Sequence, residues 1–281
     1  MREGDPSKHL RAAIGVAAFV LLTQVLPTPL TAQSSPPATS ANTQTSPGPL
    51  QSIVPPGTIL PVVLRTNLSA ETAKQNQTVR GQIAQDVPLP GDSRIRKGSR
   101  VEGQVVDVEP PTNGSAGRIS IRFDTLYSHG QVIPIRTNLR AIAGFMTVQA
   151  AGEPNAGAGE SDVYNWLETT QVGGDAVSGV GGDVYSAQND GRVVGKSLTS
   201  GGVLVQPSPN PSNRCRGSLY GNNAPQALWV FSSGACGTYG LSKVSVVHFG
   251  RTDPIGTIVF EVADRKVKLR SGDGLLLRVI G

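Results

Sequence analysis

Few residues of this chain have the types and spacing that catalysis or metal binding requires. After residue 32 the only histidines are His129, in a polar turn, and His248, between two apolar residues of a strand-like run. Neither belongs to a zinc-binding pattern, and no serine stands in the Gly-x-Ser-x-Gly context of a hydrolase nucleophile. The sequence therefore predicts no catalytic residue, no metal and no cofactor, in a protein that is not an enzyme.

Carboxylates are the alternative source of chemistry. Asp86, Asp92, Asp107 and Glu109 are candidates for the acid and base of a glycosidase. The sequence gives no separation between them, and their positions near turn-forming residues favour solvated side chains. A secreted hydrolase acting on envelope polymer is thus an alternative hypothesis, which turnover of that polymer would support.

The segment Asp190–Ser197 approaches the pattern of a phosphate-binding loop without fitting it. Three residues separate Gly191 from the Gly195-Lys196 pair, one fewer than a P-loop requires. Asp190 also places a negative charge where a glycine is needed. We expect no nucleotide site in this segment.

A basic loop offers the clearest binding chemistry. Arg94, Arg96, Lys97 and Arg100 predict a loop that faces an anion, such as a lipid headgroup, cell-wall polymer or a charged partner protein. Aromatic residues do not alternate with these cations, which argues against nucleic acid. The alternative is a charged strand edge that discourages pairing between sheets of different molecules.

The chain has two cysteines, Cys215 and Cys236. Their spacing is not that of a redox-active Cys-x-x-Cys pair, so in an oxidising compartment we expect them to form a structural disulfide. Closing a loop of this length stabilises a protein by about 3 kcal/mol in the chain-entropy account.

The N-terminal residues predict export. Residues 1–32 combine three early cations with the uncharged apolar run Ala12–Leu26 and a small residue, Ala32, which is the pattern of a signal peptide. A membrane-spanning helix needs about 20 apolar residues, so an uncleaved anchor is the less favoured alternative. Residues 33–52 are dominated by Ser, Pro, Thr, Gln and Asn and predict a solvated tether.

Residues 53–143 predict a β-barrel or sandwich module in an all-β protein, because short runs of alternating apolar and polar residues are bounded by turn formers. The alternation changes phase between Val105 and Val106, which predicts a β-bulge. Pro61 and Pro134 fall inside strand patterns and should lie at an edge, a strand start or a bulge. The expected strands are Ile59–Leu64, Thr78–Ala84, Ser99–Val108, Arg118–Leu126 and Gln131–Thr137.

The rest of the chain consists of two regions that differ in composition. Residues 144–206 are rich in glycine and carry 7 acidic against 2 basic residues, which predicts a flexible acidic insertion or loop with a short helix over Ser161–Thr170. Residues 207–281 predict a β segment, either a second module or strands that complete the first one around the insertion. Its expected strands are Ala227–Phe231, Val244–Phe249, Thr257–Val262, Lys266–Leu269 and Leu275–Ile280.

Five short segments of the first module together carry a family resemblance: Gly57-Thr58, Asp86-Val87, Lys97 to Gly103, Gly117 to Phe123 and Gly130 to Ile135. On these segments, from Pro56 to about Ile142, the module resembles the TrbI-type family, whose β-barrels form part of the outer-membrane core of conjugation (type IV) secretion channels. The resemblance implies an exported β-barrel that carries no catalytic residue. The chain keeps the family's Pro-rich spacer, shows a leader in place of its membrane anchor, and lacks its apolar helical hairpin.

Together these features predict a non-enzymatic exported protein of the bacterial envelope that acts as a structural or binding component, related to a type IV secretion core. We expect it in the periplasm, at the outer membrane or outside the cell, with envelope proteins or cell-wall polymer as partners and no nucleic acid. A third hypothesis is a carbohydrate-binding module using exposed aromatics, although core packing is their commoner use. The candidate aromatics are Trp166, Trp229 and Tyr239.

Overall fold

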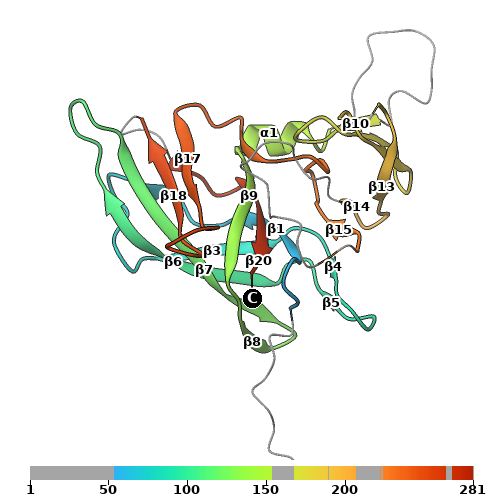
Figure 1. The fold of residues 1–281 in the computed structure, drawn as a ribbon, viewed down its shortest axis with the longest axis horizontal. Helices are drawn as coiled ribbons and strands as arrows, with labels where there is room; N and C mark the ends of the chain where they lie inside the picture. The colour runs from blue at the N-terminus through green and yellow to red at the C-terminus, as the bar shows by residue number, and fades with distance from the viewer. Residues whose placement is uncertain are drawn as a thin grey trace, which may run out of the picture. The chain divides into compact units, whose positions relative to one another are not determined.

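The computed structural model consists almost entirely of β-strands (Figure 1), which confirms the predicted all-β class. It describes residues 54–153, 168–188, 190–206, 222, 224–263 and 268–280. The predicted leader and tether, residues 1–52, lie outside these ranges. Within the described residues, no helix has the length and apolar character needed to cross a membrane.

The larger sheet joins the first module to the C-terminal strands. Its members are β1 (Ile59–Leu64), β3 (Thr78–Ile83), β6 (Arg100–Glu109), β7 (Gly117–Ser128), β8 (Gln131–Pro134), β9 (Thr137–Ala143), β16 (Gly237–Tyr239), β17 (Val244–Phe249), β18 (Ile258–Val262) and β20 (Gly274–Val279). Their order is β16-β9-β20-β1-β3-β6-β7-β18-β17, with β8 paired to β7 outside this path. The C-terminal strands therefore complete the first module instead of forming a second one.

The sheet is open, which corrects the expectation of a closed barrel. Its order begins at β16 and ends at β17, and these two strands are not paired in the described part of the chain. All neighbours are antiparallel except β16 and β9, which run parallel. The arrangement accordingly fits the sandwich alternative of the predicted fold.

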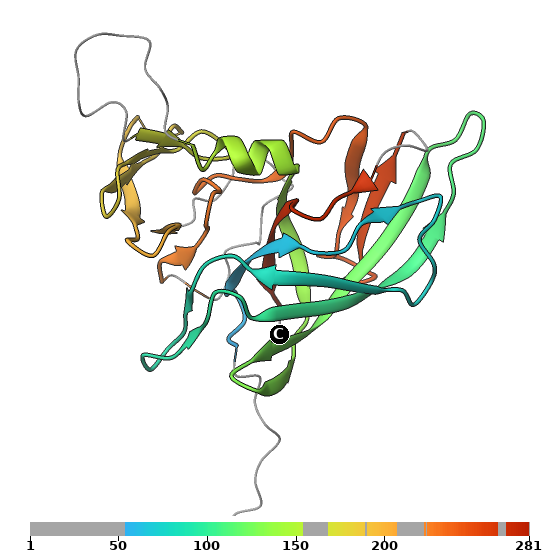
Figure 2. The same cartoon turned by 180° about the vertical axis from the view of Figure 1, so that it is seen from behind.

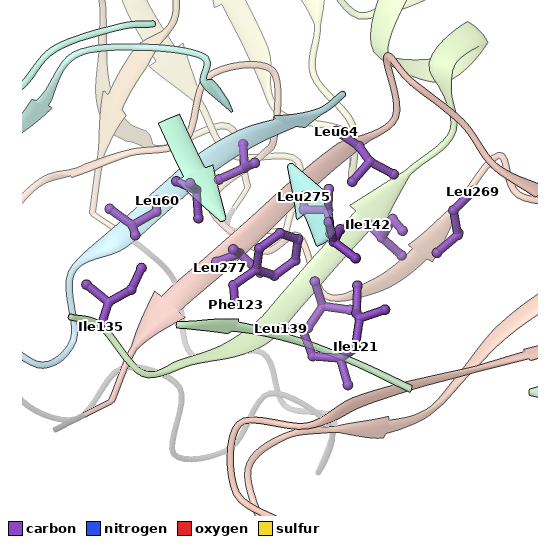
Figure 3. Packing of buried hydrophobic residues seen from close by; sticks show 14 of the residues in the cluster. Leu60, Leu64, Ile121, Phe123, Ile135, Leu139, Ile142, Leu269, Leu275 and Leu277 are labelled. Carbon is purple, nitrogen blue, oxygen red and sulfur yellow. The ribbon is translucent and has the colours of Figure 1, made fainter. Parts of the chain in front are cut away.

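The core lies between parts of this same sheet, which packs back on itself. Phe123 of β7, Leu277 of β20 and Leu139 of β9 are fully buried members of one apolar cluster (Figure 3). Strands far apart in the sheet order thus share one interior. Two short pairs lie beside the large sheet: β2 (Leu68–Ser69) with β19 (Lys268–Leu269), and β4 (Val87–Pro88) with β5 (Arg94–Ile95).

Irregularities of the strands follow the sequence closely. The β6–β7 register shifts between Val105 and Asp107, so the predicted bulge is confirmed. Pro61 lies where the β1–β3 pairing ends at Val62, and its carbonyl still accepts the Ala84 N–H at 2.9 Å. Pro134 ends β8, an edge strand, so both prolines occupy positions that tolerate a missing N–H.

The Gly-rich region folds into regular structure, and its interpretation as a long loop is wrong for the described residues. It holds helix α1 (Phe145–Ala150) and most of a six-stranded antiparallel sheet, seen from behind in Figure 2. The predicted helix is also wrong where described, because its last residues form a strand, while 161–167 lie outside the described ranges. The strands are β10 (Glu168–Thr170), β11 (Ala176–Ser178), β12 (Asp183–Tyr185), β13 (Val193–Ser197), β14 (Val203–Val205) and β15 (Gln226–Ala227).

Glycine is abundant here because the strands are short and the turns between them tight. Gly181 and Gly191 have φ values of 77° and 72°, which side chains rarely adopt. The buried valines of this sheet pack with Phe231 in a second apolar cluster. A stretch that looks unable to bury a core therefore does so through a few well-placed β-branched residues.

Two buried glutamines connect the sheets. Gln85 donates its Nε2 hydrogen to the Val203 carbonyl at 2.8 Å, and its Oε1 accepts the backbone N–H groups of Val203 and Trp229 at 3.1 and 2.7 Å. Gln226 Oε1 accepts the Ile59 N–H at 3.0 Å. These bonds satisfy backbone groups at the point where the ladders end.

Candidate functional site

The predicted basic loop is built around the β4–β5 hairpin. Val87 and Ile95 pair across this hairpin and are each 1% exposed, because both belong to the main core. The alternation of a β-strand then turns the neighbours of Ile95 outward. Arg94 and Arg96 are therefore exposed on either side of a buried anchor.

Two carboxylates already neutralise part of this loop. Asp86 lies 3.5 Å from Arg94 Nε through Oδ2, and its Oδ1 accepts the Lys97 N–H at 2.7 Å. Arg100 pairs with Glu102 at 3.2 Å and stacks over the Tyr127 ring, with its Cζ 3.9 Å from the ring centroid. Arg100 thus belongs to the surface of β6 and β7.

A groove of about 510 Å³ runs between the β4–β5 hairpin and the β7–β8 turn. Arg94 and Arg96 line it from the hairpin, and Ser128 and His129 line it from the turn. The Nδ1 of His129 lies 3.0 Å from Ser128 Oγ, and its φ of 52° is that of a turn residue, as the sequence predicts. Lys97 and Arg100 do not line the groove, so the structure brings only two of the four predicted cations together.

The groove has the chemistry of an anion site with an apolar floor. Two guanidinium groups supply planar, charge-assisted donors of the kind that bind carboxylate or phosphate. Apolar side chains that include Leu89 and Ile133 line the same space, and Asp92 is the one carboxylate that the described residues contribute to the lining. Neither Arg96 nor Lys97 makes a side-chain ion pair within the described ranges.

The remaining predicted residues are separate from this groove. Asp107 and Glu109 are exposed on β6. His248 of β17 is half-buried, with Nδ1 2.7 Å from the Thr257 carbonyl oxygen and Nε2 3.2 Å from Thr252 Oγ1, so it braces the β17–β18 connection. No group of three or more metal-ligating side chains is found in the part of the chain that the structure describes.

A second cluster of cations was not predicted from the sequence. Arg140 of β9 is 0% exposed, and its Nη2 donates to the Ser233 carbonyl at 2.8 Å. Arg251, in the β17–β18 connection, donates from Nη2 to the Leu139 carbonyl at 2.9 Å. With Arg278 of β20, which is 6% exposed, Arg140 and Arg251 form what we call the buried arginine cluster.

Burial and mutual repulsion set the electrostatics of the buried arginine cluster. Desolvation, followed by the charge of Arg251, lowers the pKa of Arg140 to about 10. Desolvation and the charge of Arg278 lower the pKa of Arg251 to about 10, and burial lowers the pKa of Arg278. The three guanidinium groups are thus close enough to destabilise one another's charged forms.

The Gly-rich region contains Gly173-Gly174-Asp175 and Gly181-Gly182-Asp183, and both aspartates have structural roles. Asp175 is fully buried, and its carboxylate accepts the Ser233 N–H at 2.7 Å and the Ala187 N–H at 3.2 Å. Asp183 pairs with Lys196 across β12 and β13 at 2.9 Å. Asp175 therefore fixes the segment that also receives Arg140.

Of the other predicted residues, Trp229 and Tyr239 are half-buried and pack against the second apolar cluster, while Trp166 lies outside the described ranges. Cys236 precedes β16 and its N–H donates to the Tyr239 hydroxyl at 2.9 Å. Cys215 is also outside the described ranges, so the disulfide stays a prediction. No protein-family model and no curated protein matches the chain.

Proposed function

We propose that this protein is a non-enzymatic component of the bacterial envelope that binds an anionic polymer or partner through the groove between the β4–β5 hairpin and the β7–β8 turn. The observation that carries the proposal is the meeting of Arg94 and Arg96 with His129 in one groove. These residues are far apart in the sequence, and the β6–β7 pairing, in which Arg100 lies opposite Tyr127, brings their segments together. Forked guanidinium donors above an apolar floor suit a carboxylate or phosphate attached to a larger molecule.

Export belongs to the same proposal. Residues 1–32 act as a cleaved leader, residues 33–52 as the tether, and Cys215 with Cys236 as a disulfide formed after export. The related assembly role, as a component akin to the TrbI-type family, remains part of the proposal. Cell fractionation with N-terminal sequencing tests the leader, and the intact mass under non-reducing conditions tests the disulfide.

The binding test compares two double variants of equal charge. Arg94→Gln/Arg96→Gln removes the groove cations, and Lys74→Gln/Arg192→Gln removes two exposed cations outside the groove. We expect cosedimentation with purified anionic cell-wall sacculi to weaken about tenfold or more in the first variant, since charged hydrogen bonds contribute about 1.5–3 kcal/mol. The control should change it less than about twofold. Equal weakening in both variants, or no binding by the wild type, would contradict the groove assignment.

The assembly part has its own measurement. An accessory binding module should sediment as a monomer or small oligomer, whereas a ring subunit of a secretion core should form a large closed assembly or co-purify with channel proteins. Turnover of the sacculi that disappears with one carboxylate variant, such as Asp92→Asn, would favour the hydrolase hypothesis instead.

A further inference from the structure

Helix α1 exposes two apolar side chains near two exposed cations. Met146 is 74% exposed and Phe145 43% exposed, although both are large apolar residues. They line a surface hollow of about 580 Å³ together with Leu241, Lys268 and Arg270. We call these five residues the α1 patch.

Hydrogen bonds from backbone N–H groups hold the α1 patch in place. Asp273 accepts the Phe145 N–H through Oδ1 at 2.8 Å and the Arg270 N–H through Oδ2 at 2.7 Å, so one carboxylate fixes both the helix start and the basic turn. The Gly144 N–H donates to the Tyr239 carbonyl at 2.9 Å. These hydrogen bonds therefore already hold the backbone of the two apolar residues and of Arg270 in fixed positions, so binding does not need to order it.

The charge of the patch is one-sided. Lys268 and Arg270 are exposed and make no ion pair with any carboxylate of the described residues. Among the described residues, Asp273 is the only carboxylate in the lining, and it is 1% exposed and accepts hydrogen bonds from two backbone amides. The patch consequently combines exposed apolar side chains with exposed cations.

We propose that the α1 patch docks onto the surface of an anionic phospholipid membrane. Phe145 and Met146 enter the headgroup region, and Lys268 and Arg270 contact lipid phosphates. This combination of a few inserted apolar side chains and adjacent cations is what peripheral membrane contact requires. A stable protein partner would instead need about 800 Å² on each side, and two exposed apolar tips supply little of it. The proposal is independent of the groove and of export.

The test places a reporter in the patch of the full chain. Met146→Trp should shift its emission to the blue, and be quenched by brominated lipid, with vesicles of equal phosphatidylglycerol and phosphatidylcholine. Vesicles of phosphatidylcholine alone should leave the emission unchanged. The wild type supplies the background of the two native tryptophans, and Val132→Trp, at a strand position 66% exposed outside the patch, is the matched reporter control. Because the reporter is local, membrane contact by residues 1–53 does not imitate the signal.

Charge variants in the Met146→Trp background then locate the cations. Lys268→Gln/Arg270→Gln should weaken partitioning about 25-fold, roughly fivefold for each cation. The charge-matched Lys74→Gln/Arg192→Gln should weaken it less than about threefold. A reporter that responds no more than Val132→Trp, equal losses in both charge variants, or a loss that instead follows Arg94→Gln/Arg96→Gln would each overturn the proposal. A protein that captures an acidic protein but gives no fluorescence response to the vesicles would overturn the proposal as well.

Discussion

The basic loop of the β4–β5 region and the buried arginine cluster place the same kind of side chain in opposite environments. Arg94 and Arg96 are exposed beside a buried isoleucine, whereas Arg140 is fully enclosed and donates to the Ser233 carbonyl. An exposed cation costs the fold little and remains free to meet a ligand. A buried one must be compensated by donors and acceptors within the protein, so it contributes to the architecture at an electrostatic cost.

The comparison also shows how one carboxylate can organise an exposed group without burying it. Asp86 holds the Lys97 backbone and faces Arg94, so the basic loop has a defined shape while its outer cations stay in water. In the buried arginine cluster, the carbonyl groups of Ser233 and Leu139 accept hydrogen bonds from Arg140 and Arg251, and a carbonyl carries no full charge. The charge of Arg251 lowers the pKa of Arg140, and the charge of Arg278 lowers the pKa of Arg251.

Arg140→Ala should give the largest effect on stability. It opens a cavity in a fully buried site and leaves the Ser233 carbonyl without its donor, so the free energy of unfolding should fall by about 3 kcal/mol. Arg96→Ala should change it by less than about 0.5 kcal/mol. Urea unfolding followed by circular dichroism measures both. Similar losses for the two variants would remove the distinction between the clusters.

Alkaline pH should relieve the electrostatic cost of burying Arg140. The folded state lowers the pKa of Arg140 from its ordinary value to about 10, so above pH 10 the unfolded chain binds more protons than the folded one. The electrostatic penalty is fully present below pH 10 and decreases as pH rises. Relative to Arg140→Met, which keeps volume without charge, the wild type should gain about 1.5 kcal/mol by pH 11. A difference in unfolding free energy that stays flat or falls from pH 9 to 11 would contradict this assignment.

Asp86→Ala should have an intermediate effect. The variant removes an acceptor for the Lys97 N–H and the partner of Arg94, and we expect it to lower the unfolding free energy by about 1 kcal/mol. Asp107→Ala is the matched control, because Asp107 is exposed on β6 and lies outside the groove. If both aspartate variants unfold at the same urea concentration, Asp86 does not organise the basic loop.

Arg100→Lys should produce the smallest effect. The variant keeps the charge beside Glu102 but loses the planar stack over Tyr127, which we expect to contribute about 0.5 kcal/mol. Arg80→Lys is the control, since Arg80 pairs with the same Glu102 at 3.1 Å. Thermal unfolding at low and high salt separates stacking from charge, and an equal change in both variants would assign the effect to charge alone.

Strand existence was predictable wherever side chains alternate over a long run. Ile59–Leu64 and Val244–Phe249 match β1 and β17 at both ends. The bulge near Val105 was predictable because a phase change in the alternation leaves no other regular solution. Gln131–Thr137 was not one strand, because the chain leaves the β7 edge after Pro134 and enters β9 in another part of the sheet.

The basic loop and the buried arginine cluster also differ in how far the sequence predicts them. The residues of the basic loop were predictable, since four cations close together in a turn-rich stretch indicate an exposed surface. Which of the four cations line the groove was not predictable, because this depends on the β7–β8 turn that brings His129 to Arg94 and Arg96. No predicted strand includes Arg140, and its burial depends in part on the segment that carries Ser233, whose carbonyl accepts its hydrogen bond.

The all-β class, most of the long strands and the outward cations followed from the amino-acid order alone, because periodicity and turn chemistry act over neighbouring residues. Tertiary structure decided that the C-terminal strands join the first module, that the Gly-rich region forms a sheet, and that three arginines share a buried site. These outcomes depend on which faces meet across long sequence separations, and local side-chain pattern carries no information about that choice.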